Sequence, residues 1–171
     1  TAYGSVGKWD RASTTLEQIA AVRPTDLPLL MRIGDARRYH GDLDGALQWY
    51  QRSARLAPES SMPGFVIAQA QVDAGRYADA IRSYTSLQRF PADVGVAEHD
   101  LGAIALLQNR GTDAAWYLRR AVKTQARVIQ TWRALIAAEL TRRDHDTALK
   151  QLERIATTWP NDAQLRYLEG V

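Results

Sequence analysis

The chain has 171 residues, of which 24% are charged and 46% are hydrophobic, and it contains no cysteine. This composition is too apolar for a disordered tail and too interrupted by charge for a membrane-spanning protein. The missing cysteine excludes a disulfide framework, a thiolate metal site and a cysteine nucleophile. The formal net charge of +3 is a weak indication of nucleic-acid binding, because a codon bias toward arginine and alanine explains it equally well.

The sequence repeats with a period of 34 residues. One column of this period contains only alanine: Ala12, Ala46, Ala80, Ala114 and Ala148. Four residues after each alanine stands a large apolar residue: Leu16, Tyr50, Tyr84, Leu118 and Leu152. Five residues before each alanine lies a column typical of turns: Gly7, Gly41, Gly75, Asn109 and Arg143. A fixed period of this length indicates stacked units of supersecondary structure.

Each unit is predicted to be a pair of antiparallel helices. Near residues 8–22 we expect the second helix of an earlier unit. Residues 27–40 then carry apolar or small residues at helical spacing, Gly41 and Asp42 interrupt them, and residues 44–57 resume the pattern until Pro58. The same order recurs along the chain. One pair cannot bury both of its apolar faces, so the pairs are expected to stack.

The order Leu30, Ile33-Gly34, Gly41, Ala46, Tyr50 and Pro58 resembles the tetratricopeptide repeat, and Trp132 stands where that family favours tryptophan. The resemblance implies an all-α fold, a right-handed α-solenoid of stacked antiparallel helix pairs. It implies one array over 1–171: a partial repeat at 1–26, full repeats at 27–60, 61–94, 95–128 and 129–162, and the start of a further helix at 163–171. Several columns depart from the family pattern: Gly64 and Glu98 replace tryptophan, Ile136 replaces a small residue, and Arg37, Gln71, Ala105 and Glu139 replace tyrosine.

The resemblance also implies that the first helices line a concave groove that holds a peptide or a folded partner. The residues expected to contact that partner are Met31, Asp35, Arg38, Tyr39, Met62, Phe65, Gln69, Val72, His99, Leu106 and Arg133. The same columns contain Asp73, Val96, Ala103, Leu107, Gln130, Ala137, Leu140 and Thr141. Chaperone-binding members of the family clamp a carboxylate with basic and amide side chains. Met31, Asp35, Phe65 and Gln69 hold those places here, so we expect an apolar segment or an amphipathic helix instead.

No residue pattern predicts catalysis, a cofactor or a metal site. His40 and His145 are expected to be exposed, and the neighbours His99 and Asp100 point in different directions on a helix and cannot share a metal. Gly4 to Trp9 only approximates a phosphate loop, because the spacing of its glycines is too short and Trp9 replaces the magnesium ligand. We therefore expect a chain that is not an enzyme.

The densest basic segment lies between Asp113 and Glu139, with no acidic residue inside it. It contains Arg119, Arg120, Lys123, Arg127 and Arg133. Interleaved aromatic residues such as Trp116 suit stacking on bases, but the helical assignment divides the charges between two faces. A solvated outer surface is the preferred interpretation, and an anionic partner is the alternative.

The leading hypothesis is a non-enzymatic protein–protein interaction scaffold, a fragment of a larger bacterial protein from the cytoplasm or the periplasm. Bacterial relatives of this kind often serve envelope assembly, such as pilus formation or exopolysaccharide export. The alternative is a nucleic-acid or polyanion-binding module that uses residues 119–133. A third hypothesis is a regulatory array fused to an enzyme.

Overall fold

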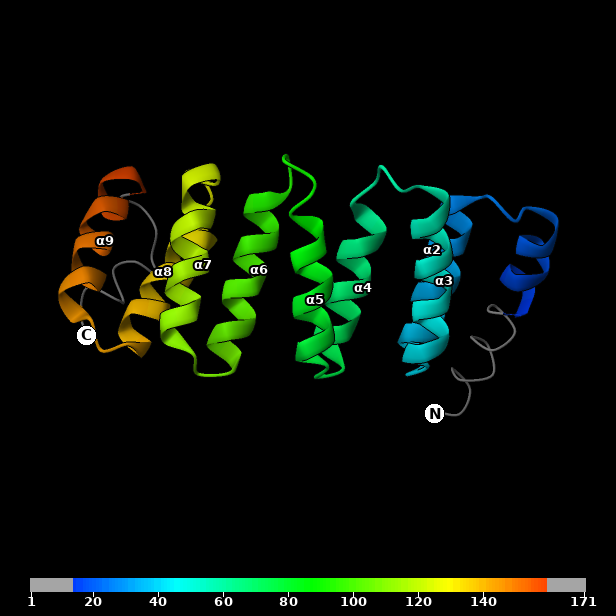
Figure 1. Ribbon diagram of the computed structural model, residues 1–171, viewed down its shortest axis with the longest axis horizontal. Coiled ribbons are helices and arrows are strands. Elements are labelled where there is room, and N and C mark those ends of the chain that lie inside the picture. The colour runs from blue at the N-terminus through cyan, green and yellow to red at the C-terminus, as the bar shows by residue number, and fades with distance from the viewer. Residues whose placement is uncertain (1–13, 160–171) are drawn as a thin grey trace. The chain divides into compact units, whose positions relative to one another are not determined.

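The computed structural model describes residues 14–159, and all regular structure within that range is helical (Figure 1). A helix over residues 14–22 is followed by α2 (Leu27–Tyr39), α3 (Leu43–Leu56), α4 (Met62–Asp73), α5 (Tyr77–Leu87), α6 (Val94–Leu107), α7 (Gly111–Thr124), α8 (Ile129–Thr141) and α9 (His145–Thr158). The predicted helix start at 163–171 lies outside the described residues. The predicted all-α helical-repeat class is confirmed, whereas the limits of the individual repeats stay predictions.

The chain divides into two compact units, Thr1–Leu87 and Gln88–Val171. In the first unit α2 packs against α3, α3 against α4, and α4 against α5. In the second unit α6, α7, α8 and α9 pack in the same successive order, and α6 also contacts α8. Each unit therefore alternates first helices (α2 and α4, α6 and α8) with second helices (α3 and α5, α7 and α9).

Close approach of the two helices of a pair depends on the small residues of the repeat. The alanines Ala46, Ala80, Ala114 and Ala148 are all buried. On the facing helix, a Cβ added at Gly34 would overlap the ring of Tyr50. A Cβ added at Gly102 would lie 2.5 Å from Cγ of Leu118. The large apolar column therefore fills the space that the small column leaves open.

The turn column adopts one conformation in every described repeat. The φ angles are +82° at Gly41, +70° at Gly75, +56° at Asn109 and +60° at Arg143. In each case the next residue donates its N–H to the carbonyl five residues before it, as Asp42 does to Arg37 at 3.0 Å and Asp144 to Glu139 at 3.0 Å. These bonds satisfy the free carbonyls at the helix end in a Schellman motif. A left-handed residue therefore ends every first helix.

The residue after the turn begins the second helix. The carboxylate of Asp42 accepts the N–H of Gly45 at 2.9 Å, and that of Asp144 accepts the N–H of Thr147 at 3.2 Å. The bond from Gly45, followed by the Arg37 guanidinium, lowers the pKa of Asp42. Hydrogen bonds from Thr147 lower the pKa of Asp144. Both carboxylates are N-caps, which explains the aspartate after the turn residue in these two repeats. In the other two repeats Arg76 and Arg110 follow the turn residue, and the Arg110 side chain makes no cap bond.

We predict that Ala80→Leu destabilises the fold, because Ala80 is fully buried between two helices. Overpacking a close contact of this kind costs about 1–3 kcal/mol. Urea unfolding followed by circular dichroism measures the change. Ala78→Leu is the matched control, because Ala78 is exposed on the same helix. An unchanged unfolding midpoint for Ala80→Leu would refute the assigned core column.

Arg143→Gly is expected to stabilise the protein, because arginine at a φ of +60° carries a strain that glycine avoids. The gain is expected to be roughly 0.5–1 kcal/mol, since glycine also adds entropy to the unfolded chain. Gly41→Ala is the reciprocal test. A Cβ at Gly41 meets no atom within 4 Å, so its expected loss of about 1 kcal/mol is a backbone effect. Thermal unfolding in which the two variants shift in the same direction would contradict this explanation.

Candidate partner-binding surface

The polar part of the predicted surface in the first unit is a bonded network. The hydroxyl of Tyr50 donates to Asp35 Oδ1 at 2.7 Å. Arg38 on α2 forms an ion pair with Asp73 on α4 at 3.4 Å. Gln69 Nε2 donates to Asp73 Oδ1 at 2.8 Å. The structure thus brings together Asp35, Arg38 and Gln69, three of the residues expected to contact a partner.

The phenol of Tyr50 connects this network to the helix core. Its ring is buried against α2, while its hydroxyl reaches the exposed carboxylate of Asp35. Burial, followed by the hydrogen bond to Asp35, raises the pKa of Tyr50 well above its usual value. One residue therefore both fills the core and orients a polar group on the surface.

The apolar residues of the first unit divide by depth. Met31 is only 8% exposed and packs against Ala46, Tyr50 and Ala70, so it belongs to the core rather than to a contact surface. Met62 is 59% exposed, and Tyr39 is also exposed. Phe65 and Val72 are half-buried, and Phe65 lies edge-on to Tyr84 with ring centroids 6.0 Å apart. Of the two methionines, only Met62 is available to a partner.

In the second unit the corresponding face is more apolar. Val96 and Leu107 of α6 and Leu140 of α8 are exposed, whereas Leu106 is half-buried against the core cluster. His99 Nδ1 lies 3.1 Å from the hydroxyl of Thr131, which joins α6 to α8. Arg133 is half-buried on α8.

The remaining histidines do not indicate a metal site. His145 is exposed, as predicted, but His40 is half-buried, contrary to the prediction, and the ring of Tyr39 lies edge-on beside it with the ring centroids 6.3 Å apart. In the part of the chain that the structure describes, no three histidine, aspartate, glutamate or cysteine side chains gather as metal ligands would. Gly4 to Trp9, the imperfect phosphate loop, lies outside that part. Across residues 14–159, no helix is both long and apolar enough to cross a bilayer.

The basic segment on α7 is not simply a solvated outer surface. Arg119 forms an ion pair with Glu139 at 2.6 Å, and Arg120 forms one with Glu98 at 2.5 Å. Glu139 is 0% exposed and Glu98 is 2% exposed. Two of the five cations thus have buried partners, which corrects the interpretation of these arginines as freely solvated. Lys123 and Arg127 are exposed.

Sequence reasoning missed these ion pairs because it treated the two glutamates only as departures from the family pattern. Their partners lie 20 and 22 residues away in sequence, too far for any helical spacing rule. The available signal was an acidic residue in a core column of a chain rich in arginine, because a buried carboxylate requires a partner.

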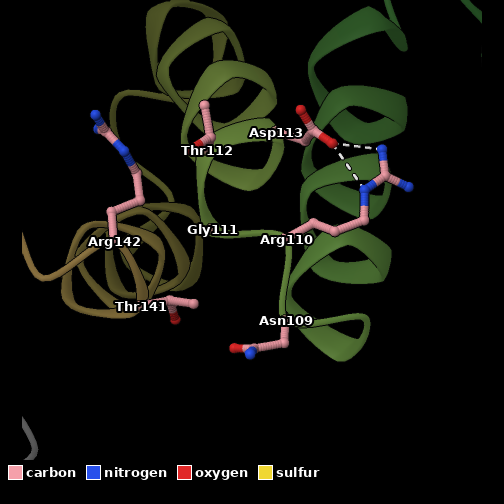
Figure 2. Close-up of a pocket in the computed structure, with 7 residues that line it drawn as sticks. All are labelled: Asn109, Arg110, Gly111, Thr112, Asp113, Thr141 and Arg142. Atoms are coloured by element: carbon pink, nitrogen blue, oxygen red, sulfur yellow. Dashed lines mark hydrogen bonds and ion pairs between the residues drawn. The ribbon is translucent and has the colours of Figure 1, made fainter.

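A polar cleft of about 340 Å³ lies where α7 begins, beside the end of α8. Figure 2 shows Arg110 turned toward Asp113, with Thr141 and Arg142 across the cleft. Arg110 forms an ion pair with Asp113, and Arg142 pairs with Glu139 at 2.7 Å. Both cations are therefore neutralised by side chains of the chain itself.

The geometry defines a helical-repeat protein whose first helices present a mixed polar and apolar face. Comparison with known proteins shows which family the chain resembles. A tetratricopeptide-repeat model matches residues 1–61, and the same 34-residue columns continue through the rest of the chain. The chain is similar to proteins of the tetratricopeptide-repeat family, whose members generally mediate protein–protein interactions.

Relatives and solved structures agree with this assignment. Superkiller complex protein 3 of Mus musculus is 28% identical, and the match covers 74% of this chain and 9% of that protein. The chain thus spans less than a tenth of the length of that curated relative. A crystal structure of MamA superposes with a TM-score of 0.74 at 14% identity, covering 94% of this chain and 87% of MamA. A tetratricopeptide repeat protein from Parabacteroides merdae gives a TM-score of 0.72 at 16% identity, covering 99% of this chain and 70% of that one. Likeness at this identity establishes the fold.

Tyr50→Phe is expected to lower the free energy of unfolding by about 1 kcal/mol, because it removes a hydrogen bond to a carboxylate that is partly solvated. Chemical denaturation measures the loss. Tyr77→Phe is the control, because within residues 14–159 the Tyr77 hydroxyl makes no hydrogen bond. Equal losses in the two variants would contradict the role of the Tyr50–Asp35 bond.

The same variant should change the alkaline limit of stability. The pKa of Tyr50 is about 10 in the unfolded chain and higher in the fold, so the stability due to its neutral phenol is complete below about pH 10. It is lost as the pH rises above that value, because only the unfolded state releases the proton. We expect Tyr50→Phe to lose less stability than the wild type between about pH 9.5 and 11. Parallel stability curves would count against a raised pKa.

Proposed function

We propose that this chain is a non-enzymatic interaction scaffold that holds a segment of a partner protein against its first helices. The observation that supports it best is the exposure of apolar side chains on those helices. In the first unit these are Tyr39 and Met62, and in the second Val96, Leu107 and Leu140. Exposed apolar residues beside bonded polar groups are typical of a surface that binds another protein.

The chemistry of this face favours an amphipathic helix or an extended apolar segment. Met62 adapts to irregular apolar surfaces, and Asp35, Arg38 and Gln69 offer polar atoms next to it. Met31 leaves the set of expected contacts because it is buried. The residues that remain proposed contacts are Asp35, Arg38, Tyr39, Met62, Phe65, Gln69, Val72, His99, Leu106 and Arg133.

The polyanion alternative is weaker than the sequence suggested, because Arg119 and Arg120 are paired with buried glutamates. Its remaining test is direct. Binding of single-stranded RNA at low salt, with an affinity that falls steeply as salt rises, would favour it over a protein partner. A role in a bacterial envelope machine stays a prediction of the sequence.

We predict that Met62→Ala and Phe65→Ala each reduce partner capture by about tenfold, as loss of an apolar anchor does. The measurement is crosslinking of the purified chain in a lysate, with quantification of the captured protein. Leu56→Ala is the matched control, because Leu56 is exposed on the second helix α3 of the same unit. Circular dichroism should show equal helicity in all three variants. Capture that survives both first-helix substitutions would refute the proposed surface.

A further inference from the structure

Two consecutive arginines of α7 extend to different helices of the second unit. Arg120 reaches Glu98 of α6, and Arg119 reaches Glu139 of α8. The arginine side chains are 44% and 47% exposed, whereas both carboxylates are buried. In each pair the arginine on the second helix α7 is partly in solvent, and the glutamate on the first helix (α6 or α8) is buried.

The same junctions are bridged elsewhere in the chain. One period after the Arg120–Glu98 pair, the guanidinium of Arg154 lies over the ring of Trp132 at 5.0 Å. Three periods before the Arg119–Glu139 pair, Arg37 bonds Glu17 at 2.5 Å, with the two charges exchanged. At each of these two junctions one other repeat therefore also has an arginine contact, with a different facing group. Of the other matching positions, Ser86–Gly64, Gln51–Gln71 and Thr85–Ala105 contain no arginine. Recurrence at matching positions indicates a role in how the helices are placed.

A buried ion pair is a poor source of stability, because removing the charges from water opposes their attraction. Its best-attested use is to select one packing among several of similar energy. The location of these pairs fits that use. Glu98 directly precedes His99, and Glu139 directly precedes Leu140. His99 and Leu140 both belong to the face proposed to bind a partner.

We propose that Arg119 and Arg120 are positioning residues for the partner-binding face of the second unit. By holding Glu98 and Glu139 against α7, they fix the rotation of α6 and α8 and thus which side chains the two helices present. This inference rests on the proposed function for its biological meaning. Its structural content is the rotation of α6 and α8, which can be measured without a partner.

The bond between His99 and Thr131 provides the readout, because it crosses from α6 to α8 at 3.1 Å. The nitrogen-15 shifts of the His99 side chain report that contact, and hydrogen–deuterium exchange reports the backbone of α6 and α8. The variants are Arg120→Met, Arg120→Met with Glu98→Met, the conservative Arg120→Lys, and Arg127→Met as a control at an exposed position.

Arg120→Met should lower the urea midpoint strongly, because a buried carboxylate loses its partner. The double variant should recover that midpoint, since no buried charge remains. Its His99 shifts should nevertheless differ from those of the wild type, and exchange within α6 should be faster by about tenfold or more. Arg120→Lys and Arg127→Met should keep the wild-type shifts.

A double variant that recovers stability and also keeps wild-type His99 shifts and exchange would overturn the proposal. So would a double variant no more stable than Arg120→Met, because Glu98 would then not be the group that Arg120 serves. Neither result bears on partner capture by Met62 and Phe65, so the proposed function fails or survives separately.

Discussion

The close approach of two helices at a small residue is the constraint on which every repeat depends. Where Gly34 faces Tyr50 and Gly102 faces Leu118, a single added methyl group would overlap the partner side chain. This contact limits how far apart the helices of a pair can lie, and the alanines of the second helix are buried as well. The turn is then fixed as well, because two helices this close leave room for only a few connecting residues.

That constraint explains why the fold could be predicted from the sequence. Small residues, large residues and turn residues recur at one period, and each column has a single packing role. Even the poor turn residue Arg143 was placed correctly, because Gly41, Gly75 and Asn109 hold the same column and the same left-handed backbone. Agreement among several columns outweighs one unfavourable residue.

The surface was predicted less well, because the period gives the direction of a side chain but not its depth. Met31 shares a column with Phe65, His99 and Arg133, and these residues range from buried to half-buried. The column of Met62 and Val96 is exposed in both repeats. Depth depends on the size of neighbours such as Tyr50 and Ala70, which pack over Met31. The sequence alone therefore does not distinguish the buried residues of this face from its exposed residues.

The two departures at the tryptophan column, Gly64 and Glu98, show how a repeat tolerates loss of its usual packing. At the tryptophan column, Gly64 is covered by Leu87, which fills the vacated space with an apolar side chain. Glu98 in the same column cannot be covered that way, because its charge requires a counter-charge at the same depth. Arg120 provides it and remains half in solvent, since its long stem spans the distance. Where an apolar side chain fills the space, the helices are held by packing. Where a charged residue stands in the column, an ion pair with a defined direction takes the place of that packing. At this column a directed ion pair at Glu98 therefore stands where Gly64 has an apolar contact.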